Sequence, residues 1–209
     1  MVAQAAELDT ARSILKAARA CLLVDGYAGL STRKIAQEAG VPLSQVHYHF
    51  GSKRGMVLAL LEAENSRRLA RQSSMYAQDA PLSRRYEQAC DFLEDDLESG
   101  YVRVLQEMIA AGWSEPDIAD AAKALLAGWY DLLTEVATEA ADQLGGLGPF
   151  SPQEVATLIG NLFIGSEALL LLGVDRHRFP IRTSLRRIGE VIRVAEQRVA
   201  LSAPREVQA

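Results

Sequence analysis

Residues 41–56, VPLSQVHYHFGSKRGM, contain the most informative pattern in this chain about its fold. Placed on a helix at about 100° per residue, Val46 and Phe50 share one face, while Ser44 and Tyr48 lie on the opposite one. The short helix expected before this one has an apolar side of its own and ends at a glycine. The two helices therefore pack on each other across a tight turn, and the second presents a polar and aromatic face. This is the geometry of a helix-turn-helix.

Two histidines in this stretch raise the alternative of a metal site. His47 and His49 are two residues apart, so their side chains diverge by about 200° on a helix, whereas helical ligand pairs are spaced by three, four or seven residues. A nucleophilic site is not favoured either, because Ser44 has no acidic partner within one helical turn. We expect no metal, no cofactor and no catalytic residue in this stretch, and no enzyme activity.

The composition is that of a helix-rich globular protein. The chain has 209 residues, of which 49% are hydrophobic and 6% aromatic. We find no continuous apolar run of about 18 residues and no basic start followed by an apolar run, so we expect a cytoplasmic protein without a membrane span. Cys21 and Cys90 lie far apart in the sequence, and we expect them to be buried thiols in a reducing compartment.

The charge of the chain is distributed unevenly. The formal net charge is -5, yet residues 1–60 carry an excess of basic side chains and the remainder is strongly acidic. A basic head on an acidic body attracts DNA at one end and repels it from the other.

Helical periodicity extends along the chain and predicts an all-α protein. The expected helices cover residues 10–24, 32–39, 42–50, 52–78, 82–98, 101–111, 116–143, 152–172 and 182–201. Gly26 is expected to stop the first of them, and Ser31 and Ser52 are candidate N-caps. Ser151 and Glu154 form a capping box with a proline between them. Gly55 lies inside a helical turn, where glycine costs about 1 kcal/mol if it is exposed to solvent.

Residues 26–60 resemble the DNA-binding head of the TetR/AcrR transcriptional regulators. The resemblance rests on Gly26-Tyr27, Thr32, Ile35-Ala36, Ala39-Gly40-Val41, Tyr48-His49-Phe50 and Ser52-Lys53. It covers about the first 60 residues, and beyond them only the layout of the helices agrees. Leu43, His47 and Gly55 depart from the residues that are usual in the family.

The resemblance implies a homodimeric repressor that binds a palindromic operator in double-stranded DNA and is released by a small-molecule effector. It implies that residues 1–55 form a three-helix helix-turn-helix DNA-binding domain and that residues 56–209 form a helical effector-binding and dimerisation domain. The implied DNA-binding residues are Thr32, Tyr48 and Lys53 at phosphates, and Arg33, Leu43, Ser44, Gln45 and His47 at bases.

The body is expected to supply a dimer interface and an effector pocket. Two apolar stripes are the candidates for the interface: Leu158, Leu162, Gly165, Leu169 and Leu172, and Leu185, Ile188, Val191, Ile192, Ala195 and Val199. The candidate pocket residues are large apolar side chains or polar groups within apolar helices: Met75, Phe92, Gln106, Met108, Trp113, Trp129, Tyr130, Asn161, Phe163 and Glu167. The alternative for both sets is burial in the core of one chain.

Two other classes of function stay open. The first is a helical dimer that binds a small molecule or a protein partner and has no DNA function, and Leu43 and His47 are the residues that favour it. The second is an enzyme that uses the pocket, which no catalytic constellation supports.

Overall fold

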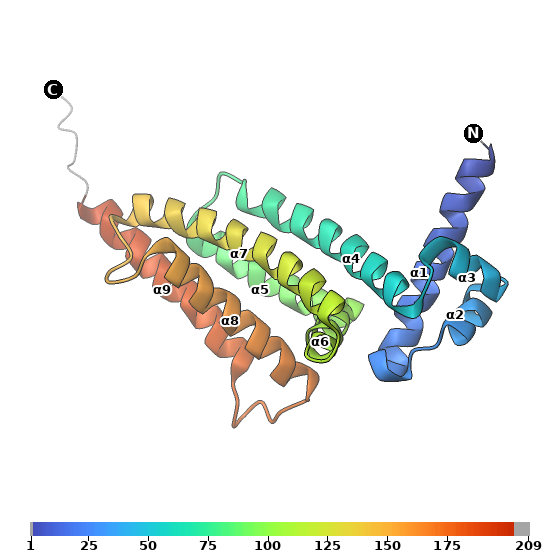
Figure 1. The fold of residues 1–209 in the computed structure, drawn as a ribbon. Coiled ribbons are helices and arrows are strands. Elements are labelled where there is room, and N and C mark those ends of the chain that lie inside the picture. The colour runs from blue at the N-terminus through green and yellow to red at the C-terminus, as the bar shows by residue number, and fades with distance from the viewer. Residues whose placement is uncertain (1, 203–209) are drawn as a thin grey trace. The chain divides into compact units, whose positions relative to one another are not determined.

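A computed structural model of the protein describes residues 2–202, with side chains from Glu7 onward, and its described backbone contains helices and no strand. The helices are α1 (Val2–Gly29), α2 (Thr32–Ala39), α3 (Leu43–Phe50), α4 (Lys53–Tyr76), α5 (Leu82–Ser99), α6 (Tyr101–Gly112), α7 (Pro116–Leu144), α8 (Pro152–Leu171) and α9 (Ile181–Ser202) (Figure 1). The prediction of an all-α protein is confirmed. From α2 to α9 the predicted helix ends agree with the observed ones to within two residues.

The first helix differs from its prediction at both ends. It begins at Val2 rather than at Thr10, and it continues to Gly29 through a kink at Gly26, which has φ 66° and ψ 175°. The helical conformation is therefore interrupted at Gly26, as predicted, but the helical segment that follows it to Gly29 was not predicted. The positive φ favours glycine, and an added Cβ would meet the carboxylate of Glu107 at 3.1 Å.

The described chain divides into two compact units. The first unit comprises Met1–Arg68 and Ser99–Leu126. Within it α1 contacts α2, α3 and α6, and α2 contacts α3. Its core includes Ile14, Leu22, Ile35, Val46 and Met56, each at most 1% exposed. The predicted domain boundary after residue 55 falls inside α4 and stays a prediction.

The second unit comprises Leu69–Glu98 and Ala127–Ala209. Its helix α5 contacts α8 through the rings of Tyr86 and Phe163, whose centroids are 6.1 Å apart. It contacts α9 at Gly189, where an added Cβ would lie 3.4 Å from the Tyr86 ring. Figure 1 shows α5, the C-terminal part of α7, α8 and α9 as the helical layers of this unit.

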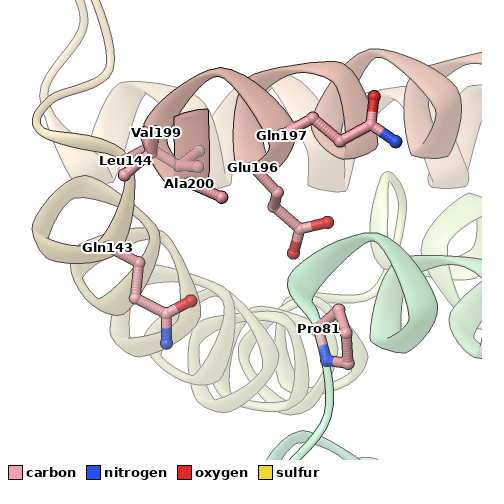
Figure 2. A pocket seen from close by; sticks show the side chains of 7 residues that line it. All are labelled: Pro81, Gln143, Leu144, Glu196, Gln197, Val199 and Ala200. Atoms are coloured by element: carbon pink, nitrogen blue, oxygen red, sulfur yellow. The ribbon is translucent and has the colours of Figure 1, made fainter. Parts of the chain in front are cut away.

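The second unit has a surface hollow of about 450 Å³ where α5 begins and α7 ends (Figure 2). Glu196 of α9 points toward the start of α5, and its carboxylate accepts hydrogen bonds from the backbone N–H of Ser83 at 3.3 Å and from the Ser83 hydroxyl at 2.5 Å. Glu196 therefore satisfies a backbone donor at the first turn of α5. The lining residues are Pro81, Gln143, Leu144, Glu196, Gln197, Val199 and Ala200, and none of them is a predicted effector residue.

Helix α8 begins at the predicted capping box. The Ser151 hydroxyl accepts from the backbone N–H of Glu154 at 3.3 Å, and the Glu154 carboxylate accepts from the backbone N–H of Ser151 at 2.8 Å. By length and hydropathy α8 would pass as a membrane span, which the sequence interpretation did not foresee. Its inner face carries the fully buried Glu167, however, so we describe it as a helix of the bundle.

The two cysteines are free and buried, as predicted. Burial raises the pKa of both thiols, that of Cys90 to about 11. Both side chains are therefore protonated and unreactive near neutral pH.

Candidate nucleic-acid interface

The two faces of α3 lie as the sequence predicted. Val46 is 1% exposed and points toward the core of the first unit, to which Ile35 and Ala36 of α2 also belong. On the other side Gln45 is exposed, and Tyr48 is 70% exposed. The predicted helix-turn-helix packing is therefore confirmed, and α3 presents a polar and aromatic surface.

The turn between α2 and α3 is fixed by its backbone. Gly40 ends α2 in the left-handed conformation, with φ 66° and ψ 30°. The N–H groups of Gly40 and Val41 donate to the carbonyls of Gln37 and Ala36, which closes the helix end. Ser31 occupies the N-cap position of α2 as predicted, but its side chain makes no cap hydrogen bond.

The predicted base-reading residues differ in exposure. Arg33, Ser44, Gln45 and His47 are exposed, whereas Leu43, the first residue of α3, is half-buried. A nitrogen of the His47 ring, Nδ1, lies 3.1 Å from the carbonyl oxygen of Gly51. With Nδ1–H donating to that carbonyl, the ring is oriented, and Nε2 is the nitrogen that is left to meet a base edge.

The histidines of α3 do not belong to a cluster of candidate metal-binding side chains among the described residues. Among residues 2–202 no group of three or more His, Cys, Asp or Glu side chains is arranged to hold a metal ion. His49 is half-buried, and its ring contacts the Tyr48 ring edge-on with centroids 5.1 Å apart. It therefore supports the aromatic surface of α3.

The predicted phosphate-binding residues lie at the starts of two helices and on α3. Thr32 is the first residue of α2 and is half-buried, and Tyr48 is exposed. Lys53 is the first residue of α4, and its Nζ lies 4.3 Å from the centroid of the Tyr27 ring. Ser52 caps α4 as predicted, because its Oγ accepts from the backbone N–H of Gly55 at 3.0 Å.

The structure explains why residue 55 is a glycine, which the sequence alone did not. A Cβ at this position would lie 2.3 Å from the carbonyl oxygen of Phe50. The end of α3 and the start of α4 therefore approach so closely that any side chain at residue 55 would push them apart. The expectation that glycine is merely a weak helix former here is incomplete.

A surface hollow of about 460 Å³ borders α3 in the first unit. Glu7 and Thr10 of α1, the turn residues Val41 and Pro42, and Gln45 and Tyr48 of α3 line it. The sequence interpretation missed Glu7 because it began the first helix at Thr10. The carboxylate of Glu7 therefore lies beside the predicted DNA-binding surface, where it disfavours phosphate.

The predicted dimer stripes divide into exposed and internal parts. On α8 Leu158, Leu162 and Leu169 are 38–55% exposed and Gly165 is exposed, and Leu172, the C-cap residue of α8, is 76% exposed. On α9 Leu185 is 2% exposed, Ile188, Ile192 and Ala195 are half-buried, and Val199 is exposed. Leu185 faces the interior of its own chain because it lies on the side of α9 that packs on α5. Val191 and Val194 of α9 are 68% and 47% exposed, which is more than Val199 at 39%.

The predicted pocket residues do not all lie in one unit. Gln106, Met108 and Trp113 belong to the first unit, and Met108 is fully buried. Trp113 is 83% exposed, because it follows the last residue of α6 and points away from the core. The expectation that Trp113 lines a pocket is not supported by this placement.

The other pocket candidates belong to the second unit. Met75, Trp129, Phe163 and Glu167 are buried, Phe92 and Tyr130 are half-buried, and Asn161 is exposed. The hydroxyl of Tyr130 donates to the side-chain oxygen of Asn161 at 2.7 Å. The sequence interpretation missed Gln72 and Tyr86, whose side-chain oxygens are buried without a hydrogen-bond partner in the described part of the chain. No periodicity distinguishes such residues from exposed polar ones.

Comparisons with known proteins agree with this geometry. The family model described as "Bacterial regulatory proteins, tetR family" matches residues 14–60, which span most of α1, α2, α3 and the start of α4. No curated protein matches the chain.

Several solved structures have the same fold. A TetR-family regulator from Agrobacterium tumefaciens has 19% sequence identity and a TM-score of 0.74, with 87% of this chain and 98% of that chain covered. FadR from Bacillus subtilis, in complex with stearoyl-CoA, has 15% identity and a TM-score of 0.70, with 87% and 96% covered. A candidate regulator from Saccharomonospora viridis, in complex with choline, has 22% identity and a TM-score of 0.72, with 87% and 94% covered.

The structural likeness shows the fold, and the match over α1–α4 adds the DNA-binding helix-turn-helix. Residues 14–60 thus carry the N-terminal helix-turn-helix of the tetR family of bacterial regulatory proteins, and the chain has the fold of solved TetR-family transcriptional regulators.

Proposed function

We propose that the protein is a homodimeric repressor that binds a palindromic operator and is released from it by a small-molecule effector. The observation that carries this proposal is the exposed polar and aromatic face of α3 opposite the buried Val46. A helix with one face fixed in the core and the other exposed is suited to the major groove of DNA. We propose that it acts in the cytoplasm and without catalysing a reaction.

The DNA contacts that we propose follow the placement of the side chains. Ser44, Gln45 and His47 of α3, with Arg33 of α2, read base edges, and the half-buried Leu43 adds an apolar contact. Thr32, Tyr48 and Lys53 bind phosphates, because they lie at helix starts or at the edge of the exposed face.

We propose that α8 and α9 form the dimer interface. Leu158, Leu162, Gly165, Leu169 and Leu172 are spaced by four, three, four and three residues, so they lie in one stripe of α8. Their exposure supports contact with a second copy, because large apolar stripes on a surface mark interaction sites. On α9 we assign Val191 and Val194 to the interface together with Val199, and we leave Leu185 in the core.

We propose that the effector binds inside the second unit, near Trp129, Tyr130 and Phe163. The buried side-chain oxygens of Gln72 and Tyr86, which have no partner among the described residues, support a ligand with hydrogen-bonding groups. The structural neighbours that hold stearoyl-CoA and choline support a small-molecule ligand of this kind. Effector binding lowers operator affinity if it favours a dimer whose two heads no longer match the operator.

The substitution Tyr48→Ala tests the DNA-binding face. Each subunit would lose a phosphate contact and an aromatic contact, so we expect operator affinity to fall by about 10- to 100-fold for the two subunits together. The substitution leaves folding intact, because Tyr48 is 70% exposed. Tyr48→Phe keeps the ring and removes only the hydroxyl, so its affinity should be intermediate. Unchanged affinity of Tyr48→Ala would show that this face does not bind DNA.

The operator itself is found by selecting purified protein against a random pool of duplex DNA and sequencing the bound fraction. We expect an enriched palindrome with half-sites about one DNA turn apart. No enrichment at low salt from a folded dimer would favour the alternative, a helical dimer that binds a small molecule or a protein without DNA function.

A further inference from the structure

The start of α4 carries two adjacent cations. Lys53 Nζ lies over the Tyr27 ring, and Arg54 Nη1 lies 2.8 Å from the Oδ2 of Asp117, which belongs to the first turn of α7. All four residues belong to the first compact unit. The Arg54 and Asp117 side chains are each 55% exposed, so their ion pair is open to solvent.

The first turn of a helix is an unusual place for an arginine that has no further role. The positive end of the helix dipole disfavours cations there and favours anions. Asp117, in contrast, suits the first turn of α7. The dipole of α4 therefore does not stabilise the Arg54 cation, and we attribute its position to the anions that it binds. Asp117 is one such anion, and an operator phosphate close to Lys53 is a second.

The start of α7 is joined to the same region at a second point. Glu115 accepts a hydrogen bond from the Tyr27 hydroxyl at 2.6 Å, and the backbone N–H of Tyr27 donates to Glu107 of α6 at 2.9 Å. Burial and the hydrogen bond to Glu115 raise the pKa of Tyr27, so its hydroxyl stays a donor. Tyr27 thus connects α6 and the start of α7 to the place where α4 begins, and Asp117 is held within reach of Arg54.

We propose that Arg54 binds a backbone phosphate of the operator, and that Asp117 holds the same guanidinium in the free protein. Asp117 and the phosphate then compete for one cation, and the ion pair lowers the affinity of the protein for its operator. This inference rests on the proposed function and assigns a phosphate contact beyond Lys53. An exposed ion pair contributes little stability, so a phosphate can replace its carboxylate at low cost.

The test is a double-substitution cycle with the duplex that the wild-type dimer selects. Binding is measured by fluorescence anisotropy from about 50 to 300 mM KCl, a range in which phosphate contacts dominate the salt dependence. We expect Asp117→Asn to raise affinity by about 2- to 20-fold for the two subunits at low salt. We expect Arg54→Gln to lower affinity and to reduce the slope of log K against log salt concentration by about 0.9 per subunit.

The double variant separates competition from general repulsion. If Asp117 acts by holding Arg54, Asp117→Asn raises affinity in the wild-type background and not in the Arg54→Gln background. Asp120→Asn is the matched control, because it removes one carboxylate from the same end of α7, where Asp120 pairs with Lys123 at 2.8 Å. It should change affinity less than Asp117→Asn does.

Three results would overturn the inference. If Asp117→Asn raised operator affinity equally in the wild-type and Arg54→Gln backgrounds, Asp117 would act only by repelling the DNA phosphates. An Arg54→Gln variant with the wild-type salt slope would remove the phosphate contact, while the proposed function would stand. A folded wild-type dimer that binds no duplex would overturn the proposed function as well.

Discussion

At the scale of single residues, one buried cation determines much of the packing in the second unit. The Arg85 guanidinium is 3% exposed and makes two hydrogen bonds to the Glu139 carboxylate, at 2.9 and 2.5 Å, and one to the carbonyl oxygen of Tyr76 at 2.6 Å. It therefore joins the end of α4, α5 and α7. A buried guanidinium that lost this carboxylate would keep its charge and have too few acceptors.

We predict that Glu139→Gln destabilises the protein by about 1–3 kcal/mol at pH 7. Breaking a fully buried pair costs about 3–5 kcal/mol, and the smaller value follows because Glu139 is 41% exposed. The hydrogen bonds from Arg85 lower the pKa of Glu139 below its ordinary value of 4.5. Its contribution is therefore fully present above the unfolded-state pKa and is lost as the pH falls through the folded-state pKa.

Chemical denaturation at a series of pH values measures this difference. The stability gap between wild type and Glu139→Gln should be largest near neutral pH and should shrink below about pH 4. Glu135→Gln, at an exposed position one turn earlier on α7, is the control and should have little effect. A gap of the same size at every pH would show that packing, and not the ion pair, is what the substitution removes.

Buried charged residues such as Arg85 could not be predicted from the sequence. Arg84 and Arg85 are adjacent in the sequence, yet Arg84 is exposed and Arg85 is buried. Periodicity assigns apolar residues to a face, but it does not reveal a polar side chain that is buried because a partner from another helix meets it. The large apolar pocket candidates were chosen for their size, and size did not exclude the exposed Trp113.

At the scale of helices, the sequence predicted most of the chain, because starts and stops are encoded locally. The capping box of α8, the glycine that ends α2 and the serine that caps α4 depend on residues within one or two turns. The start of α1 has no such signal, whereas its kink at Gly26 was signalled by the glycine itself. The faces of α2 and α3 were predictable because their apolar residues pack on each other within 20 residues of sequence.

The junction of α3 and α4 gives a prediction at this scale. Glycine to alanine in a helix usually stabilises by up to about 1 kcal/mol. Gly55→Ala should instead destabilise by about 1–3 kcal/mol, because the added Cβ would lie 2.3 Å from the Phe50 carbonyl oxygen and the two helices would have to shift. The shift would move Lys53 relative to α3, so we also expect weaker operator binding. Thermal denaturation and DNA binding measure the two effects.

Gly128→Ala is the matched control for this substitution. Gly128 lies within α7, and an added Cβ would have its nearest neighbour at 3.7 Å, an ordinary contact distance. This variant should therefore be as stable as the wild type or more stable, with unchanged operator binding. A stabilised Gly55→Ala would show that α3 and α4 adjust to a methyl group without strain.

At the scale of the whole molecule, the all-α fold class could be predicted from the sequence, but the residues of the proposed dimer interface could be predicted only in part. An apolar stripe indicates that a helix face is buried and does not reveal what covers it. On α9 Leu185, the first residue of the stripe, is buried within its own chain, while the predicted leucines of α8 are exposed. The exposed stripe of α8 is therefore the part of the proposed interface that the monomer supports best.

We predict that Leu162→Glu converts the dimer into monomers. Leu162 and Leu171 are 38% and 37% exposed, and their separation of nine positions in the sequence places their side chains on opposite sides of α8. Leu171→Glu therefore adds the same charge at equal exposure outside the stripe, and it should leave the dimer intact. Sedimentation velocity measures the oligomeric state, and operator binding should be lost with the dimer, because a palindrome requires two heads. If Leu162→Glu stays dimeric, the interface lies on another face of the second unit. The same conclusion follows if Leu171→Glu is monomeric as well as Leu162→Glu.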